Sequence, residues 1–424
     1  MVFDVTLSMR IPIVLLFIGF FTFSHAENEN AIIDDNIKTV LLSRSGDVYN
    51  PSPIIPLSGE YTLNLSFDYL SAENKFFQYT FYHCDANWEP TNLEQNEYLD
   101  GNFINEISDF KFSTNTLQTY VHYKLSFPND EIKFSKSGNY ILKIFTNFDQ
   151  EELALTRRFM VVDTRTKISV TAQGATNPKD RFYKHEIDFE VDYKDFTIPN
   201  PFNDVRAVVL QNNSWHNAVM DLKPLFVNNN NLSFNYEDKN LFDAGAEFRF
   251  FDIRTLRFFS NNVRKKFVDS LTNVVLNPQE IKAHLTYLRQ VDYNGKRVVQ
   301  NTDGRNVAEE GDYAMVHFFL KAGNEIKDRD VYIYGELSDW RLTEEFKMDY
   351  IPEKAGYYKM VKLKQSYYNY QFVTFDDDNN QVEFDFTEGN HYQTSNDYTV
   401  LIYHRNQMYD YDELIGYATT SSGM

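Results

Sequence analysis

Apolar and polar residues alternate along much of this chain, and a period of two residues is typical of β-strands. Between Tyr61 and Tyr69 every second residue is Tyr, Leu or Phe, and the residues between them are Thr, Asn, Ser and Asp. The same alternation covers Val121 to Phe127 and ends at a Pro-Asn-Asp turn. Sustained helical periodicity is hard to find. The pattern predicts an all-β protein of tandem immunoglobulin-like β-sandwich domains with little helix.

Two polar, turn-forming segments divide this pattern, one at residues 163–167 and one at Asn277-Pro278. They predict an N-terminal sandwich over residues 27–165, a central sandwich over 166–278 and a C-terminal sandwich over 279–424 with a frayed tail. The strand-like run at 247–253 falls in the central segment, and the run at 398–403 falls in the C-terminal segment.

The first 26 residues have the features of a secretory signal peptide. Arg10 precedes an apolar run over residues 11–23, and Ser24-His25-Ala26 provides a small-x-small end. This run is too short for a comfortable membrane span, which needs about 20 residues, so a retained anchor helix is the weaker alternative. We expect an exported protein that is cleaved after Ala26 and does not insert into a membrane.

The charge of the chain excludes some partners. Its 424 residues carry a formal net charge of −20, so phosphate backbones and anionic membrane surfaces repel it. Nucleic acid is therefore not an expected partner. Cys84 is the single cysteine, which rules out an intrachain disulfide. The fold must depend on its hydrophobic cores.

Motifs for catalysis or metal binding are missing or incomplete. The chain lacks Gly-x-Ser-x-Gly, Gly-x-Gly-x-x-Gly, His-Glu-x-x-His and Cys-x-x-Cys. His83-Cys84 suggests a nucleophile pair, but adjacent strand residues point to opposite faces, which favours a buried, inert Cys84. We expect no catalytic, cofactor or metal site, and a hydrolase with dispersed carboxylates stays a weak alternative.

Two acidic segments could suggest a cation site. Asp376-Asp377-Asp378 resembles the start of a calcium loop, but Gln381 and Thr387 stand where an EF-hand has Gly and Glu. A polar hairpin turn is the better interpretation. Residues 186–192 place four carboxylates on one face of a strand, which is typical of a solvated face.

The C-terminal segment resembles the early-set immunoglobulin-like modules of glycogen-binding domains and glycoside hydrolases. A strand ends in Gly335, the following turn carries Trp340, and a late strand carries alternating aromatics that include Tyr368 and Tyr370. Some relatives stack sugar on such a tryptophan, whereas most keep the ring for packing. The resemblance therefore leaves a periplasmic carbohydrate-binding protein as an alternative function.

A more specific set of strings runs through the first two segments. In chain order they occupy residues 65–70, 82–88, 97–101, 115–116, 120–123, 127–129, 137–140, 156–159, 211–218 and 247–253. Their number and order resemble the plug protein family of the type IX secretion system of Bacteroidota. The turn at residues 99–103 departs from the family pattern, because Asn102 separates Gly101 from Phe103.

The resemblance implies a non-enzymatic periplasmic protein, peripheral to the inner side of the outer membrane. Such a plug binds the periplasmic mouth of a giant outer-membrane translocon β-barrel and closes its pore. It would exclude or alternate with a shuttle protein at the lateral exit. Exposed aromatics are typical anchors of such contacts, which makes the loops at Trp88, Trp215 and Trp340 candidates. The competing hypothesis places each tryptophan in the core of its own sandwich.

Overall fold

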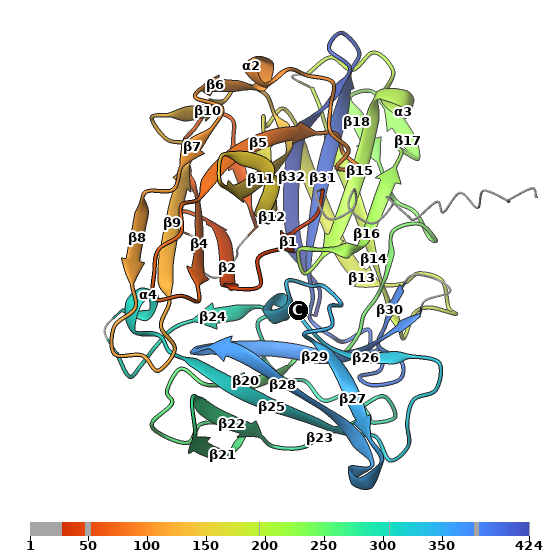
Figure 1. Ribbon diagram of the computed structural model, residues 1–424. Coiled ribbons are helices and arrows are strands. Elements are labelled where there is room, and N and C mark those ends of the chain that lie inside the picture. Colours follow the sequence, from red (N-terminus) through yellow and green to blue (C-terminus); the bar gives the residue numbers. More distant parts are fainter. Residues whose placement is uncertain (1–27, 47–51, 195, 305, 377–380, 424) are drawn as a thin grey trace, which may run out of the picture.

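The computed structural model describes residues 28–46, 52–194, 196–304, 306–376 and 381–423 (Figure 1). The predicted signal peptide with its cleavage point after Ala26 lies outside these residues, as do residues 377–380 of the predicted polar turn. Within the described ranges the chain is built almost entirely of strands. The helical elements there are one-turn segments: α2 (Gln95–Tyr98), α3 (Pro201–Asp204), α4 (Val307–Glu310), η1 (Glu336–Ser338) and η2 (Pro352–Lys354). The prediction of an all-β protein with little helix is confirmed.

The N-terminal unit is a sandwich of two sheets. The outer sheet has the order β2 (Ile37–Arg44), β4 (Leu63–Tyr69), β9 (Val121–Phe127) and β8 (Asp109–Phe112). The inner sheet has the order β1 (Ala31–Ile32), β12 (Asp149–Val162), β11 (Gly138–Thr146), β5 (Gln78–Cys84) and β7 (Asn105–Glu106), with β3 (Ile54–Pro56) parallel to β12. A separate pair joins β6 (Leu99–Gly101) to β10 (Ile132–Phe134). The predicted alternating strands are β4 and β9, whose apolar faces fill the core between the sheets.

The central unit is a second sandwich. One sheet contains β13 (Lys167–Gly174), β14 (Lys184–Asp192), β18 (Asn231–Ser233) and β17 (Phe226–Asn228), with β19 (Leu241–Asp243) beside β14. The other contains β16 (Ser214–Leu222), β15 (Val205–Gln211), β31 (Asp397–Asn406) and β32 (Tyr411–Ser421). The second sheet therefore takes half of its strands from the far end of the chain.

The position of β31 and β32 corrects two expectations. The run at 398–403 does not belong to the C-terminal sandwich, because Val208 of β15 pairs with Leu401 of β31. The tail is not frayed, because Ala418 pairs with Val400 and β32 continues to Ser421. In Figure 1 this blue hairpin runs between the orange N-terminal strands and the green central strands. The physical reason is the run at 400–403, which is apolar on both faces and therefore needs cover from both sides.

The C-terminal unit lies below the other two in Figure 1. Its strands pair in the order β20 (Arg249–Asp252), β29 (Ser366–Asp376), β26 (Asp330–Tyr334), β27 (Lys347–Ile351), β28 (Gly356–Lys364), β25 (Tyr313–Lys321), β22 (Thr272–Leu276) and β21 (Val263–Val268). Short strands join them: β23 (Gln279–Glu280) beside β25, and β24 (Arg297–Val299) and β30 (Gln381–Glu383) beside β29.

The run at 247–253, expected in the central sandwich, supplies β20 of the C-terminal unit instead. Phe251 packs there against Phe318 and stacks on Tyr368, so the aromatic core of this unit draws the run in. Sheets thus exchange strands across Asn277-Pro278, and the division of the chain into three domains stays a prediction.

Four sheets stack in a row through the upper part of the molecule. Alternate residues of β11 face two different cores: Leu142 packs between the two N-terminal sheets, and Ile141 packs against the layer that contains β31. In the same way, Val400 faces the central core and Leu401 faces the N-terminal unit. The β16-β15-β31-β32 sheet is consequently covered on both faces. The N-terminal and central units share one continuous apolar stack.

Candidate functional site

The tryptophans Trp88 and Trp215 meet where the N-terminal unit contacts the central sheet. Trp88 is 2% exposed, and its ring lies edge-to-face with that of Trp215, with ring centroids 4.8 Å apart. The guanidinium of Arg158 lies over both rings, 4.6 Å from the Trp88 centroid and 5.8 Å from the Trp215 centroid. Cation–π contacts of this kind favour a guanidinium over an ammonium. The two rings therefore form a packed contact between units, with Trp215 half-buried at its edge.

Trp340 lies in the C-terminal unit, directly after η1. Its ring packs edge-to-face against Tyr334 and Phe248, at centroid distances of 5.3 Å and 6.0 Å. Gly295 makes this approach possible, since a Cβ at that position would stand 2.3 Å from the Trp340 ring. Trp340 is half-buried, so part of its side chain is accessible.

Tyr368 and Tyr370 are each 1% exposed and form part of the apolar core of the C-terminal unit. Burial raises the pKa of both hydroxyls well above the ordinary value. A buried ring cannot stack on a sugar, so the predicted carbohydrate platform of Trp340, Tyr368 and Tyr370 is not assembled. The carbohydrate-binding alternative is therefore not favoured.

A cavity of about 100 Å³ opens where all three units meet, and we call it the junction pocket. Trp215 and Trp340 both line it, so two of the predicted site residues come together there. The other lining side chains include Asn30, Arg157, Arg158, Asn212, Asn213, Lys296, Arg297, Glu336 and Asp339. In a chain of net charge −20, this pocket carries two more cationic than anionic side chains.

Several of these charges are paired, and two of the pairs cross between units. Arg157 Nη2 lies 2.8 Å from Asp339 Oδ2, which joins β12 to the turn after η1. Asp339 also lies 3.5 Å from Arg297 Nη2, and Lys296 Nζ lies 2.8 Å from Asp397 Oδ2. These ion pairs hold the walls of the junction pocket in place.

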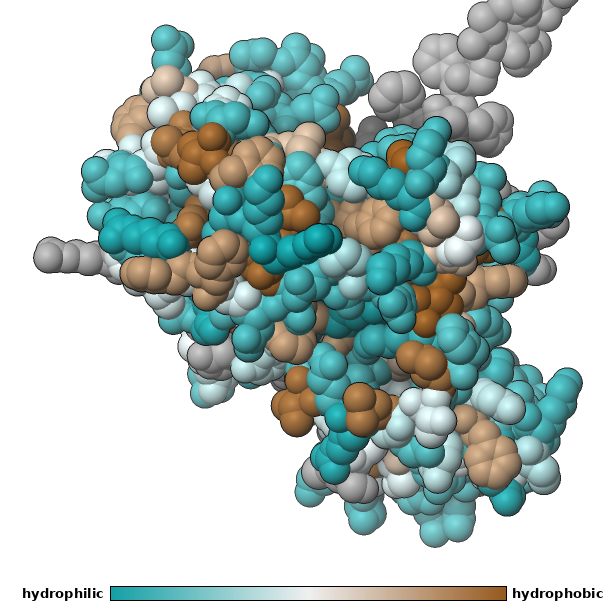
Figure 2. Space-filling view, turned by 90° about the horizontal axis from the view of Figure 1, so that it is seen from below, coloured by the Kyte–Doolittle hydropathy of each residue, from teal (hydrophilic) through white to brown (hydrophobic). Residues whose placement is uncertain are grey.

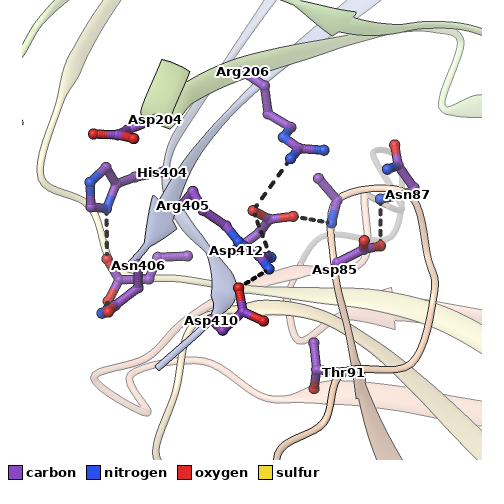
Figure 3. A network of polar contacts seen from close by, with 12 residues as sticks. Asp85, Asn87, Thr91, Asp204, Arg206, His404, Arg405, Asn406, Asp410 and Asp412 are labelled. Atoms are coloured by element: carbon purple, nitrogen blue, oxygen red, sulfur yellow. Dashed lines mark hydrogen bonds and ion pairs between the residues drawn. The ribbon is translucent and has the colours of Figure 1, made fainter. Parts of the chain in front are cut away.

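A polar latch closes the contact between the N-terminal unit and the β31–β32 hairpin (Figure 3). Asp412 is fully buried and accepts a hydrogen bond of 3.0 Å from the backbone N–H of Ala86. The same carboxylate pairs with Arg405 at 3.4 Å and Arg206 at 3.8 Å. Figure 3 shows both guanidinium groups turned toward Asp412, with the loop that carries Asp85 on the other side. One carboxylate thus fixes a loop of one unit to strands of another.

A buried charged network joins the N-terminal unit to the C-terminal unit. Asp68 Oδ2 of β4 lies 2.7 Å from Lys364 Nζ of β28 and accepts a hydrogen bond of 2.7 Å from the Tyr313 hydroxyl. His122 Nδ1 lies 2.6 Å from the other carboxylate oxygen. Burial by itself raises the pKa of Asp68, but Lys364 and His122 together hold it below its ordinary value. The carboxylate is therefore charged over the whole neutral range.

The remaining sequence candidates are the adjacent residues His83 and Cys84, and both are buried. Cys84 is a free thiol inside an apolar cluster, and burial raises its pKa to about 12. Burial also lowers the pKa of His83 to about 4. The ring nitrogens of His83 form hydrogen bonds with the Thr91 hydroxyl and the Ser137 carbonyl, and not with Cys84. The interpretation of Cys84 as a buried hydrophobe is confirmed.

No group of three His, Cys, Asp or Glu side chains in the described ranges could hold a metal ion. The part of the chain that the structure describes also contains no helix with the length and apolarity of a membrane span.

Sequence reasoning missed the arginines and carboxylates of the junction. Their signal was present at 156–159, where two adjacent arginines interrupt an apolar strand. Neighbouring strand residues face opposite sides, so both Arg157 and Arg158 had to be covered by something. Asp339 and Asp412 gave no comparable signal, because each lies in or beside a polar turn and only the tertiary fold buries it.

Comparison with known proteins places the chain in a family. Residues 37–163 match the model of the type 9 secretion system plug protein first domain. A solved structure of a hypothetical protein from Parabacteroides merdae is 31% identical, with a TM-score of 0.89 over 93% of this chain and 99% of that one.

Other matches are weak or missing. The BSP domain of a biofilm-associated protein is 8% identical, with a TM-score of 0.15 over 93% of this chain and 60% of that one. A serine-rich repeat adhesion glycoprotein from Streptococcus agalactiae is also 8% identical, with a TM-score of 0.12 over 92% of this chain and 97% of that one. Neither likeness is strong enough to carry an argument, and no curated protein matches. On the family model, whose match covers residues 37–163, the chain belongs to the type 9 secretion system plug protein family.

Proposed function

We propose that this protein closes the periplasmic mouth of the outer-membrane β-barrel through which the type IX system secretes its cargo. The observation that carries the proposal is the family match over residues 37–163. The protein would act in the periplasm without catalysis, and it would alternate with a shuttle protein at the lateral exit of the barrel.

The joins between the units support a blocking role. A body that occludes a wide pore must keep its shape, and here the units share a core and are tied by buried ion pairs. Because these pairs are buried between the units, losing one partner would leave an unpaired buried charge and weaken the contact. A rigid body of this kind can block an opening and later dissociate from it without unfolding.

The surface of the protein offers exposed aromatic residues for contact with the barrel. Figure 2 shows hydrophobic residues in several separate patches on the face seen from below, with hydrophilic residues between them. Phe258 and Phe259 are adjacent on the loop between β20 and β21, and they are 72% and 69% exposed. Large exposed rings side by side are typical anchors of protein interfaces.

Hydrogen bonds hold the loop that carries Phe258 and Phe259 in a defined conformation. Lys266 donates to the backbone carbonyls of Thr255 and Phe258, and the backbone N–H of Leu256 donates to Asp303. A preorganised loop loses little conformational entropy on binding. We therefore propose this loop as a barrel contact in addition to the accessible parts of Trp215 and Trp340.

The test is a pull-down of the tagged mature protein from solubilised outer membranes, followed by mass spectrometry. We expect a very large β-barrel in near-equal amount, and reduced recovery with Phe258→Ser/Phe259→Ser. Phe226→Ser is the matched control, because Phe226 is 64% exposed in the central unit and should leave recovery unchanged. Recovery of the chain alone with the wild-type protein would exclude the plug function, and equal recovery with the loop variant would exclude only this loop.

A further inference from the structure

Arg158 is the one pocket arginine whose charge is not paired in the described part of the chain. Its Nε donates to the Asn28 carbonyl at 2.6 Å, and no carboxylate of a described residue lies within ion-pairing distance of it. Glu29 interacts with Arg158 only by longer-range electrostatic attraction. Burial lowers the pKa of the Arg158 guanidinium to about 10. Its terminal nitrogens are thus available to a ligand, while Trp88 and Trp215 fix the plane of the group.

A second arginine of the junction pocket, Arg297, is more deeply buried than Arg158. The Arg297 side chain is 7% exposed, and its Nε is buried without a hydrogen-bond partner among the described residues. Its Nη2 is occupied by the Val40 carbonyl at 2.6 Å and by Asp339. This Nε is closed off from solvent, so Arg297 contributes its positive charge to the pocket and not this N–H.

We propose that the junction pocket binds a carboxylate group, with Arg158 as its hydrogen-bond donor, Arg297 as a second positive charge beside it, and Trp215 and Trp340 among its walls. The planar fork of a guanidinium matches a carboxylate in a bidentate geometry. This inference does not rest on the plug function. It concerns a pocket whose lining residues come from all three units.

The size and charge of the pocket select this ligand chemistry. Ordinary ligand pockets enclose about 300–1,000 Å³. At about 100 Å³ the junction pocket is too small for a sugar or a nucleotide and suits one functional group. Glu336 and Asp339 also line it, and they repel a dianion such as phosphate more strongly than a monoanion. The carboxylate could belong to a small free acid or to an acidic residue of a polypeptide.

Intrinsic fluorescence can report the binding, because the chain has three tryptophans and all of them lie at this junction. The titrants are acetate, inorganic phosphate and the peptide acetyl-Gly-Asp-Gly-amide, with acetyl-Gly-Asn-Gly-amide as the neutral control. We expect a saturable change with acetate, with the Asp peptide or with both, and none with the Asn peptide. Equal affinities would indicate a free acid as ligand, and tighter binding of the peptide would indicate a polypeptide.

Two variants test the assignment of the donor. Arg158→Gln should weaken binding at least about tenfold, because a hydrogen bond to a charged group is lost. Arg158→Lys keeps the positive charge but lacks the planar fork of the guanidinium, and it should also weaken carboxylate binding. This more conservative variant keeps the test valid if Arg158→Gln fails to fold. Arg181→Gln, on the exposed turn between β13 and β14, is the matched control. The proposal is overturned by no saturable change below ~10 mM, by preferential binding of inorganic phosphate, or by unchanged affinity in both Arg158 variants.

Discussion

The N-terminal unit contacts its two neighbours by different chemistry. Against the central sheet it presents mainly apolar side chains, and the shared cluster contains Ile141, Met160, Leu401 and Leu414. The buried carboxylate of Asp412 is a polar exception. Against the C-terminal unit it presents charged and hydroxyl groups centred on Asp68. We call these contacts the apolar join and the ionic join.

The difference has consequences for how each join responds to its surroundings. Burial of apolar area is non-directional and nearly independent of pH, so the apolar join tolerates changes of protonation. A buried ion pair depends on exact partners, and the loss of one partner leaves the other charged and desolvated. The ionic join should therefore be the more vulnerable of the two to a single substitution.

The largest effect is expected from Lys364→Met in the ionic join. Lys364 is 2% exposed, and its removal leaves Asp68 buried without its cation. The free energy of unfolding should fall by about 3–5 kcal/mol, measured by denaturant titration. Lys38→Met is the matched control, because the Lys38–Glu345 pair crosses the same join at the surface and should contribute about 1 kcal/mol or less. Equal stability of the two variants would contradict this account of the ionic join.

In the apolar join, Leu401→Ala should have the next largest effect. Leu401 is fully buried opposite Val208, so truncation opens a cavity between two sheets and costs about 3 kcal/mol. Leu117→Ala, at a side chain that is 54% exposed, should change stability by no more than about 0.5 kcal/mol. A Leu401→Ala loss that varied with pH would show that the two joins are not independent.

A smaller loss should follow from Tyr403→Phe, which removes one polar contact inside the apolar join. The Tyr403 hydroxyl donates to Asn139 Oδ1 at 2.8 Å, and Asn139 is fully buried. The variant leaves this oxygen without a partner, at a cost of about 2 kcal/mol. Tyr183→Phe, at an exposed ring, is the control for loss of a hydroxyl. If both variants were equally stable, packing alone would account for the apolar join.

The sequence predicted the sandwich layers far better than the connections between them. Alternation identifies a strand with one covered face, as in β4 and β9, because the polar half of the pattern marks the solvent side. The apolar runs at 207–210 and 400–403 carry no such mark. They indicate burial on both faces, but nothing in them specifies which two sheets provide the cover.

The candidate site was predictable to a lesser degree. Trp215 and Trp340 do line the junction pocket, but they approach it from different units over a long sequence separation. Tyr368 and Tyr370 belong to a regular core strand, and their alternation predicts a buried face as readily as a binding face. Whether the predicted tryptophans contact a partner stays a prediction that the pull-down variants can test.

The β31–β32 hairpin, which forms one side of the apolar join, also carries Glu413, and this residue provides the smallest and most specific test of the comparison. Burial by itself raises the pKa of Glu413, but hydrogen bonds with His404, Asn406 and Tyr411, together with Arg165, lower it from 4.5 to about 2. The folded-state pKa is below the unfolded value, so the stabilisation is complete above pH 4.5 and is lost as the pH falls toward 2. Glu413→Gln should therefore be about 1 kcal/mol less stable than the wild-type protein at neutral pH. This gap should close between pH 4.5 and 2, measured by denaturant titration at each pH. The control is Glu60→Gln at an exposed position, which should show no such gap. A gap of constant size for Glu413→Gln would mean that the Glu413 side chain stabilises the fold through packing. The pH sensitivity of stability would then be confined to the ionic join.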